Sequence, residues 1–139
     1  MLKVLVDMVA TLADRITEIL DPAVMLPAVS QGALGLEARE GDAPTRERVA
    51  RLDHPASFAA VLAERSLLRD LGGGCRLPIG GWARIEGGVL VLSGCACSPD
   101  GSRVLRAASS GPPDAAEQLG AKVAAELRLQ GAAELLAVV

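Results

Sequence analysis

Cys75 is the residue whose surroundings most suggest chemistry. It follows three glycines and precedes a proline by three residues, in the stretch AERSLLRDLGGGCRLPIGG at 63–81. Glycines lack a side chain and allow positive φ, so a large group could approach the backbone beside this thiol. A thiolate is a strong nucleophile and can form a lasting thioether bond. By spacing alone, however, the favoured interpretation is a helix stop followed by a small, buried structural cysteine.

The other two cysteines, Cys95 and Cys97, alternate along a predicted strand, so their side chains should share one face. Together with Cys75 and His54 they could form a Cys3His zinc site. The paired spacings typical of such sites are absent, and a single C-x-C is a weak signal. The pattern therefore favours ordinary core thiols, and we predict no metal.

The elements that must position Cys75 can be placed from periodicity and turn residues. In the first third of the chain we expect a helix at 10–20, a bend at Ser30-Gln31-Gly32 and a buried strand at 33–39. A polar break at 40–44 leads to a short helix that ends near Leu52. A second helix fits 56–71 and ends at the glycine run.

After Cys75 the hydrophobic period changes from that of a helix to that of strands. Residues 77–85, 88–97 and 103–109 read as three strands joined by short turns, which predicts an antiparallel meander. Asp114 and Glu117 form a capping-box pattern for a long helix that stops at Gly131. The predicted fold class is therefore α+β, a three-stranded antiparallel sheet with helices packed on one face.

Composition limits the class of protein further. The chain has 139 residues, of which 50% are hydrophobic and 22% charged, as in a globular domain. A net charge of −3 argues against a nucleic-acid partner. No apolar run approaches the roughly 20 residues that span a bilayer, so we expect no membrane association. Three cysteines with no secretion signal indicate reduced thiols and a cytoplasmic location.

Several separated blocks of sequence resemble one known family. From Glu64 to Gly80 the chain reads E-R-x-L-x-x-x-L-x-G-G-C-x-L-P-I-G, and residues 26–39 read LPAVSQGALGLEAR. SPDG, GPPDAAEQLG and QGAAELL follow in order. These blocks closely resemble the C-terminal part of hydroxymethylbilane synthase, also called porphobilinogen deaminase. Ser30 stands where that family usually has glycine.

The resemblance implies a transferase of tetrapyrrole (heme) biosynthesis. Cys75 would carry a dipyrromethane cofactor through a thioether, and Gln31 and Gly32 would contact the cofactor in the cleft. Four porphobilinogen molecules are joined stepwise to the cofactor in this family, each with loss of ammonia. Porphobilinogen and the growing oligopyrrole are therefore the implied partners.

The resemblance also implies how the chain is divided. The family has three domains, so residues 1–44 would be the remnant of the preceding α/β domains, a helix plus a strand. Residues 45–139 would be the C-terminal α+β domain to which the cofactor is attached. No catalytic residue is assigned within this fragment, and we expect the chain alone to be inactive. The alternative is a non-catalytic, degenerate fragment that acts only as a binding or interaction domain.

Overall fold

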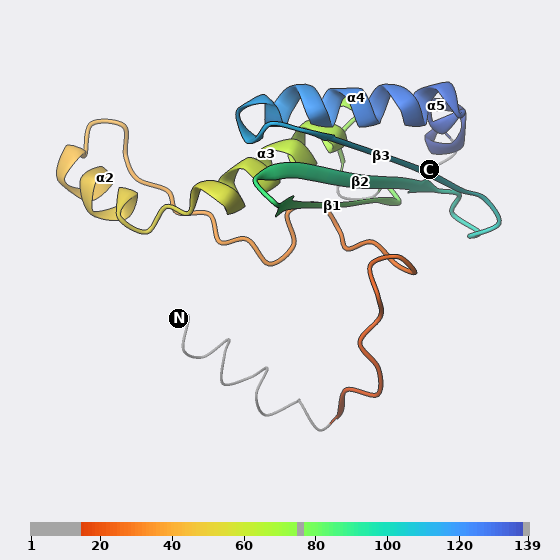
Figure 1. Ribbon diagram of the computed structural model, residues 1–139, viewed down its shortest axis with the longest axis horizontal. Helices are drawn as coiled ribbons and strands as arrows, with labels where there is room; N and C mark the ends of the chain where they lie inside the picture. Colours follow the sequence, from red (N-terminus) through yellow and green to blue (C-terminus); the bar gives the residue numbers. More distant parts are fainter. Residues whose placement is uncertain (1–14, 75–76, 138–139) are drawn as a thin grey trace.

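The chain folds around one three-stranded antiparallel sheet with helices on one side. The computed structural model describes residues 15–74 and 77–137. Figure 1 shows the strands β1 (Ile79–Glu86), β2 (Val89–Cys97) and β3 (Val104–Gly111) side by side in sequence order. The predicted α+β class and meander are therefore confirmed.

Two tight turns give the sheet its register. Gly87 and Gly88 connect β1 to β2 with φ of 57° and 84°. Positive φ at both positions is what a two-residue hairpin turn requires, and glycine adopts it without strain. Between β2 and β3, the Asp100 carboxylate accepts hydrogen bonds from Ser98 Oγ and from the backbone and hydroxyl of Ser102. These bonds stabilise the charged form and lower the pKa of Asp100 to about 2.

Within residues 15–74 and 77–137, four helices accompany the sheet. They are α2 (Ala43–Ala50), α3 (Pro55–Asp70), α4 (Ala116–Leu129) and α5 (Ala132–Leu136), with a short 3₁₀ turn η2 (Pro113–Ala115) before α4. Helices α3, α4 and α5 all contact the sheet, and α4 and α5 run along one side of it in Figure 1. Helix α2 has no buried residue and projects away from this assembly.

The core lies between the helices and the sheet. Its completely buried side chains come from both layers, and include Leu67 on α3, Leu90 and Leu92 on β2, and Leu127 on α4. The two main helices approach very closely at Gly120, where a Cβ would lie 2.4 Å from the carbonyl oxygen of Ala63. Ser66 Oγ donates to the carbonyl oxygen of Glu117 across this contact, at 2.8 Å. A glycine at this position therefore permits the observed spacing of α3 and α4.

The start of α4 differs from the prediction. Asp114 lies in the 3₁₀ turn, and the N-cap residue Ala115 makes no side-chain capping bond. Glu117 instead pairs with Arg69 of α3, with 3.3 Å between Oε1 and Nη1. The capping-box prediction is therefore wrong, because the helix begins two residues later and Glu117 turns toward a tertiary partner. The predicted end of the helix is correct, since Gly131 follows Gln130 with φ of 99°.

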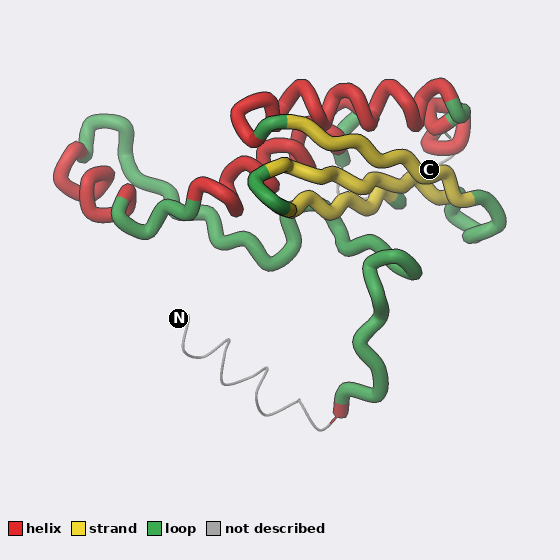
Figure 2. Tube along the Cα trace, viewed as in Figure 1, coloured by secondary structure: helices red, strands yellow, loops and turns green. Residues whose placement is uncertain are grey.

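The region before α2 also differs from the prediction. Residues 16–20 and 33–39 form no helix or strand, and Figure 2 shows residues 16–42 as loop. The predicted helix at 10–20 is therefore wrong for its second half, and its first half lies outside the described residues. An isolated helix needs a surface for its apolar face, and a strand needs a neighbour for its backbone bonds. Ile19 is 86% exposed and Leu34 70%, so the described residues provide neither.

Candidate functional site

Cys75 lies outside the described residues, which end at Gly74 and resume at Leu77. The segments that flank it are the end of α3 and the start of β1. Helix α3 ends at Asp70 with Leu71 as its C-cap, after which Gly72 and Gly73 adopt positive φ of 108° and 42°. The Gly73 amide donates to the carbonyl oxygen of Leu68 at 2.9 Å, which closes the helix. Beyond Cys75, the Leu77 amide donates to the carbonyl oxygen of Gly74 at 3.2 Å. The candidate attachment point therefore sits between the end of α3 and the start of β1.

The glycines beside this point leave open space. A Cβ added at Gly72 would meet nothing within 4 Å, and one added at Gly74 would meet only Leu77 Cγ at 3.9 Å. Gly72 and Gly73 are also exposed. The described flanks thus leave room for a bulky adduct, so they fit a covalently attached group such as a dipyrrole.

Gln31 and Gly32 lie in a surface turn, as the bend prediction required. Gly32 has φ of 83°, and a Cβ there would meet nothing within 4 Å. Both residues are exposed, and Gln31 Oε1 accepts from the Ala28 amide at 3.3 Å. Ser30 has φ of 60°, a left-handed conformation that disfavours residues with a Cβ. Glycine would adopt this conformation more readily than serine does.

A cavity of about 340 Å³ connects the segment before this turn with the segment that follows Cys75. It is lined by Val24, Met25, Leu26 and Ala28 on one side and by Leu77, Pro78, Ile79, Gly80, Cys95, Cys97, Val104 and Arg106 on the other. Arg106 Nη2 donates to the carbonyl oxygen of Val24 at 2.8 Å. The structure thus brings residues 24–28 and 77–80 together, although they are about 50 positions apart in sequence.

Cys95 and Cys97 share one face of β2, as predicted, and the register places that face opposite the helices. Cys95 is only 7% exposed. Burial is the main cause that raises its pKa, followed by the neighbouring Cys97. A buried thiol with a raised pKa is a poor nucleophile, so Cys95 fits the predicted role of packing. Cys97 is only partly buried.

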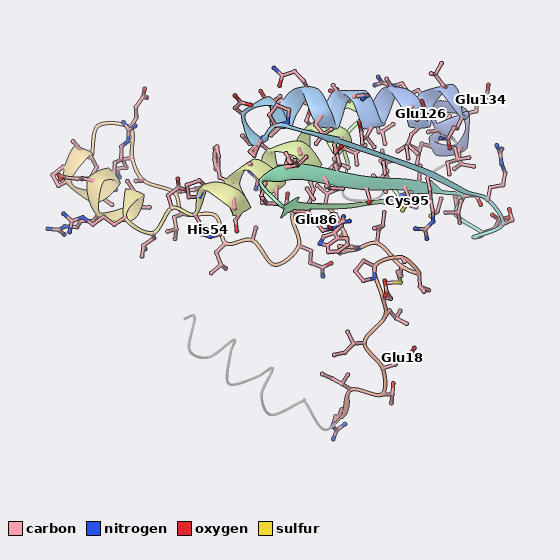
Figure 3. All side chains as sticks on the ribbon, viewed as in Figure 1. Glu18, His54, Glu86, Cys95, Glu126 and Glu134 are labelled. Carbon is pink, nitrogen blue, oxygen red and sulfur yellow. The ribbon has the colours of Figure 1, made fainter. Side chains whose placement is uncertain are left out.

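Three members of the alternative zinc site lie among the described residues, namely His54, Cys95 and Cys97. His54 is the N-cap residue of α3, and its Nδ1 accepts from the Ser57 amide at 3.3 Å. Figure 3 shows His54 and Cys95 toward opposite ends of the molecule. Within residues 15–74 and 77–137, no group of three or more His, Cys, Asp or Glu residues could hold a metal ion. In the same residues, no helix is long and apolar enough to cross a membrane.

One residue was missed by sequence reasoning as a functional candidate. Glu64 is a charged residue on the buried side of α3, only 7% exposed. Its two carboxylate oxygens accept hydrogen bonds from the amides of Ser30 and Ala83. The signal was present, since Glu64 lies next to Ala63 and three residues before Leu67, on the apolar stripe of the predicted helix.

Comparisons with known proteins agree on one family. A family model described as "Porphobilinogen deaminase, C-terminal domain" matches residues 58–129, and a second, "Porphobilinogen deaminase, dipyromethane cofactor binding domain", matches residues 8–47. A curated porphobilinogen deaminase of Synechococcus sp. (strain RCC307) is 49% identical over 126 residues, which are 91% of this chain and 40% of the relative. That of Desulforudis audaxviator is 48% identical over 126 residues, or 91% of this chain and 41% of the relative. The chain therefore spans about two fifths of the length of these relatives.

Proposed function

Because the chain belongs to the porphobilinogen deaminase family, whose cofactor is dipyrromethane, we propose that it forms the cofactor-carrying part of such an enzyme. The observation that carries the proposal is the stretch from Glu64 to Gly80, which lies within the match to the C-terminal domain. Its cysteine falls on the connection between α3 and β1, where the flanking glycines leave space for an adduct.

In this proposal, Cys75 is the covalent anchor of the cofactor. The thiolate sulfur displaces the amino group at an aminomethyl carbon of a pyrrole, so that a C–S bond forms as a C–N bond breaks and ammonia leaves. This thioether bond is made once rather than at every turnover. The bound cofactor supplies the pyrrole to which porphobilinogen units are added, with loss of ammonia at each addition. Gln31 and Gly32 contact the cofactor from their exposed turn, which lies within the match to the cofactor-binding domain.

The division of the chain follows from the same proposal. Residues 1–44 are the tail of the preceding α/β domains, and residues 45–139 are the C-terminal domain. The two family matches, at 8–47 and 58–129, support a boundary in this region. We place the enzyme in tetrapyrrole biosynthesis in the cytoplasm, with porphobilinogen and the growing oligopyrrole as its small-molecule partners.

The proposal assigns no catalytic residue to this chain. The one carboxylate that is buried among the described residues, Glu64, already accepts two backbone hydrogen bonds. These 139 residues span about two fifths of the length of the relatives, and we expect the groups that stabilise developing charge in the remaining part. We therefore expect these 139 residues alone to be inactive.

The experiment compares the chain with a hybrid. The part of the Synechococcus relative that precedes the match is joined in front of the matched part of this chain, and both proteins are given porphobilinogen. We expect no measurable turnover by the chain alone, turnover by the hybrid, and none by the hybrid that carries Cys75→Ser. Turnover by the pure chain, or unchanged activity of the Cys75→Ser hybrid, would contradict the proposal.

A further inference from the structure

Glu64 occupies an unusual place for a carboxylate. It lies on α3 with 7% of its surface exposed, and its stem passes over Gly81 of β1. A Cβ added at Gly81 would lie 3.8 Å from Glu64 Cγ and 3.2 Å from Val29 Cγ2. Burying a carboxylate costs several kcal/mol unless hydrogen bonds compensate, so its partners should reveal why it is there.

The partners of Glu64 lie on two different segments. Oε1 accepts from the Ala83 amide of β1 at 2.7 Å, and Oε2 accepts from the Ser30 amide at 2.6 Å. Both distances are at the short end of the range for N–H donors and charged acceptors. A single side chain thus joins α3, the free edge of β1 and the turn that contains Gln31 and Gly32.

These bonds continue a short ladder along the edge of β1. Two residues before Ala83, the Gly81 amide donates to the carbonyl oxygen of Pro27 at 3.0 Å, and Ala28 forms an isolated bridge with Gly80. At Ser30 the chain leaves the strand edge with φ of 60°. Where the segment 27–30 turns away from β1, the Glu64 carboxylate therefore replaces a backbone carbonyl as the acceptor for the next β1 amide.

The geometry requires a carboxylate in particular. Both oxygens accept from N–H groups, whereas a glutamine would present one acceptor and one amide donor to the same two donors. Burial raises the pKa of Glu64, and the two backbone bonds oppose this by stabilising the charged form.

From this geometry we infer that Glu64 is a positioning residue, which fixes the Ser30–Gly32 turn on the sheet edge and so sets where Gln31 and Gly32 stand relative to β1. The inference rests on the proposed function, because that function makes Gln31 and Gly32 cofactor contacts. Strand β1 links this turn to Cys75 along the chain, because it contains Ala83 and begins four residues after Cys75.

The first test uses the unsubstituted 139-residue chain and needs no cofactor. Amide chemical shifts of Ser30 and Ala83 are followed by NMR as a function of pH. Because one carboxylate accepts from both amides, we expect both shifts to follow a single midpoint, above the usual pKa of a glutamate. Different midpoints for the two amides, or no titration at Ser30, would overturn the inference.

The second test uses Glu64→Gln, with Glu117→Gln as the matched control on an exposed, ion-paired glutamate. We expect Glu64→Gln to abolish the shared titration and to speed amide exchange at Ser30 at least about tenfold, as the loss of a charge-assisted hydrogen bond implies. The Gln31 and Gly32 resonances should move, while those of α4 stay. Unchanged exchange at Ser30 would overturn the inference. If Glu64→Gln fails to fold, the pH titration of the unsubstituted chain still decides.

These tests are independent of the proposed anchor. A chain in which Cys75 proves unable to carry a dipyrrole can still show the shared titration of Ser30 and Ala83. Conversely, a loaded Cys75 with no shared titration would leave the proposed function standing and remove the role of Glu64.

Discussion

Residues 15–42 and residues 55–136 both contain large apolar side chains, but the two regions differ in how deeply these side chains are buried. In the second region Leu67, Leu90 and Leu127 are completely buried. In the first, Ile19 is 86% exposed and Leu34 70%. The difference lies in the partners that each region finds among the described residues, and not in hydrophobicity. A periodic pattern therefore predicts which face of a helix or strand is suited to burial. It does not predict whether another segment is present to cover that face.

The two regions are joined by a seam of hydrogen bonds to β3, to the edge of β1 and to α3. Backbone atoms of Val24, Pro27 and Ser30 bond to Arg106, Gly81 and Glu64, respectively. The same seam holds the turn with Gln31 and Gly32 against α3, through the bond between Ser30 and Glu64. The region without regular helices or strands thus contains two of the three candidate site residues.

Hydrogen exchange should show the largest contrast between the regions. Residues 34–39 donate no backbone hydrogen bond to any of the described residues, so we expect their amides to exchange near the rate of an unstructured chain. Amides of β2 and α4, such as those of Leu92 and Val123, should exchange at least about 10³-fold more slowly, in keeping with a global stability of several kcal/mol. Equal protection of 34–39 and β2 in a demonstrated monomer would contradict the expected difference between the two regions.

Replacing Gly120 with alanine tests the core of the second region. The new Cβ would lie 2.4 Å from a backbone oxygen and 2.6 Å from Ser66 Cβ, so α3 and α4 must separate. We expect the free energy of unfolding to fall by about 3 kcal/mol in urea denaturation. Gly111→Ala is the control, because its Cβ would meet only Leu119 Cδ1 at 4.0 Å. A loss no greater than that of the control would contradict the described packing.

Ser30→Gly tests the seam and should have a smaller effect. Glycine adopts the observed φ of 60° without the penalty that a side chain carries. We expect the free energy of unfolding to rise by up to about 1 kcal/mol. The same change at Ser110, an exposed position in β3, should lower it by about 0.5–1 kcal/mol. A destabilising Ser30→Gly would mean that the turn does not hold this conformation.

The sequence predicted the second region well because its elements are local or pair with near neighbours. The glycine run ends α3, two glycines form the β1–β2 turn, and Gly131 ends α4, all of which are backbone requirements visible in single residues. The start of α4 was predicted wrongly because Glu117 prefers Arg69, a residue 48 positions away. A local sequence pattern does not show that a distant residue such as Arg69 binds the Glu117 side chain in place of the helix end.

The candidate site was predictable only through family resemblance. From spacing alone, Cys75 reads as a structural cysteine, and nothing local separates Gln31 and Gly32 from an ordinary turn. Glu64 was visible as a charge on an apolar helix face, but its partner Ser30 lies 34 positions away. Contacts of that range depend on how the segments pack, so sequence could indicate that Glu64 had a partner without identifying it.

The central claim is that Cys75 is the thiol that carries the dipyrromethane. Its most direct test is the intact mass of the hybrid enzyme, in which the Synechococcus segment precedes this chain, with Cys75→Ser compared with the Cys95→Ala/Cys97→Ala double variant. Cys95 is buried with a raised pKa, so we expect the double variant to keep the mass of a thioether-linked dipyrrole and Cys75→Ser to lack it. A dipyrrole adduct on Cys75→Ser, or its loss from the double variant alone, would show that Cys75 is not the anchor.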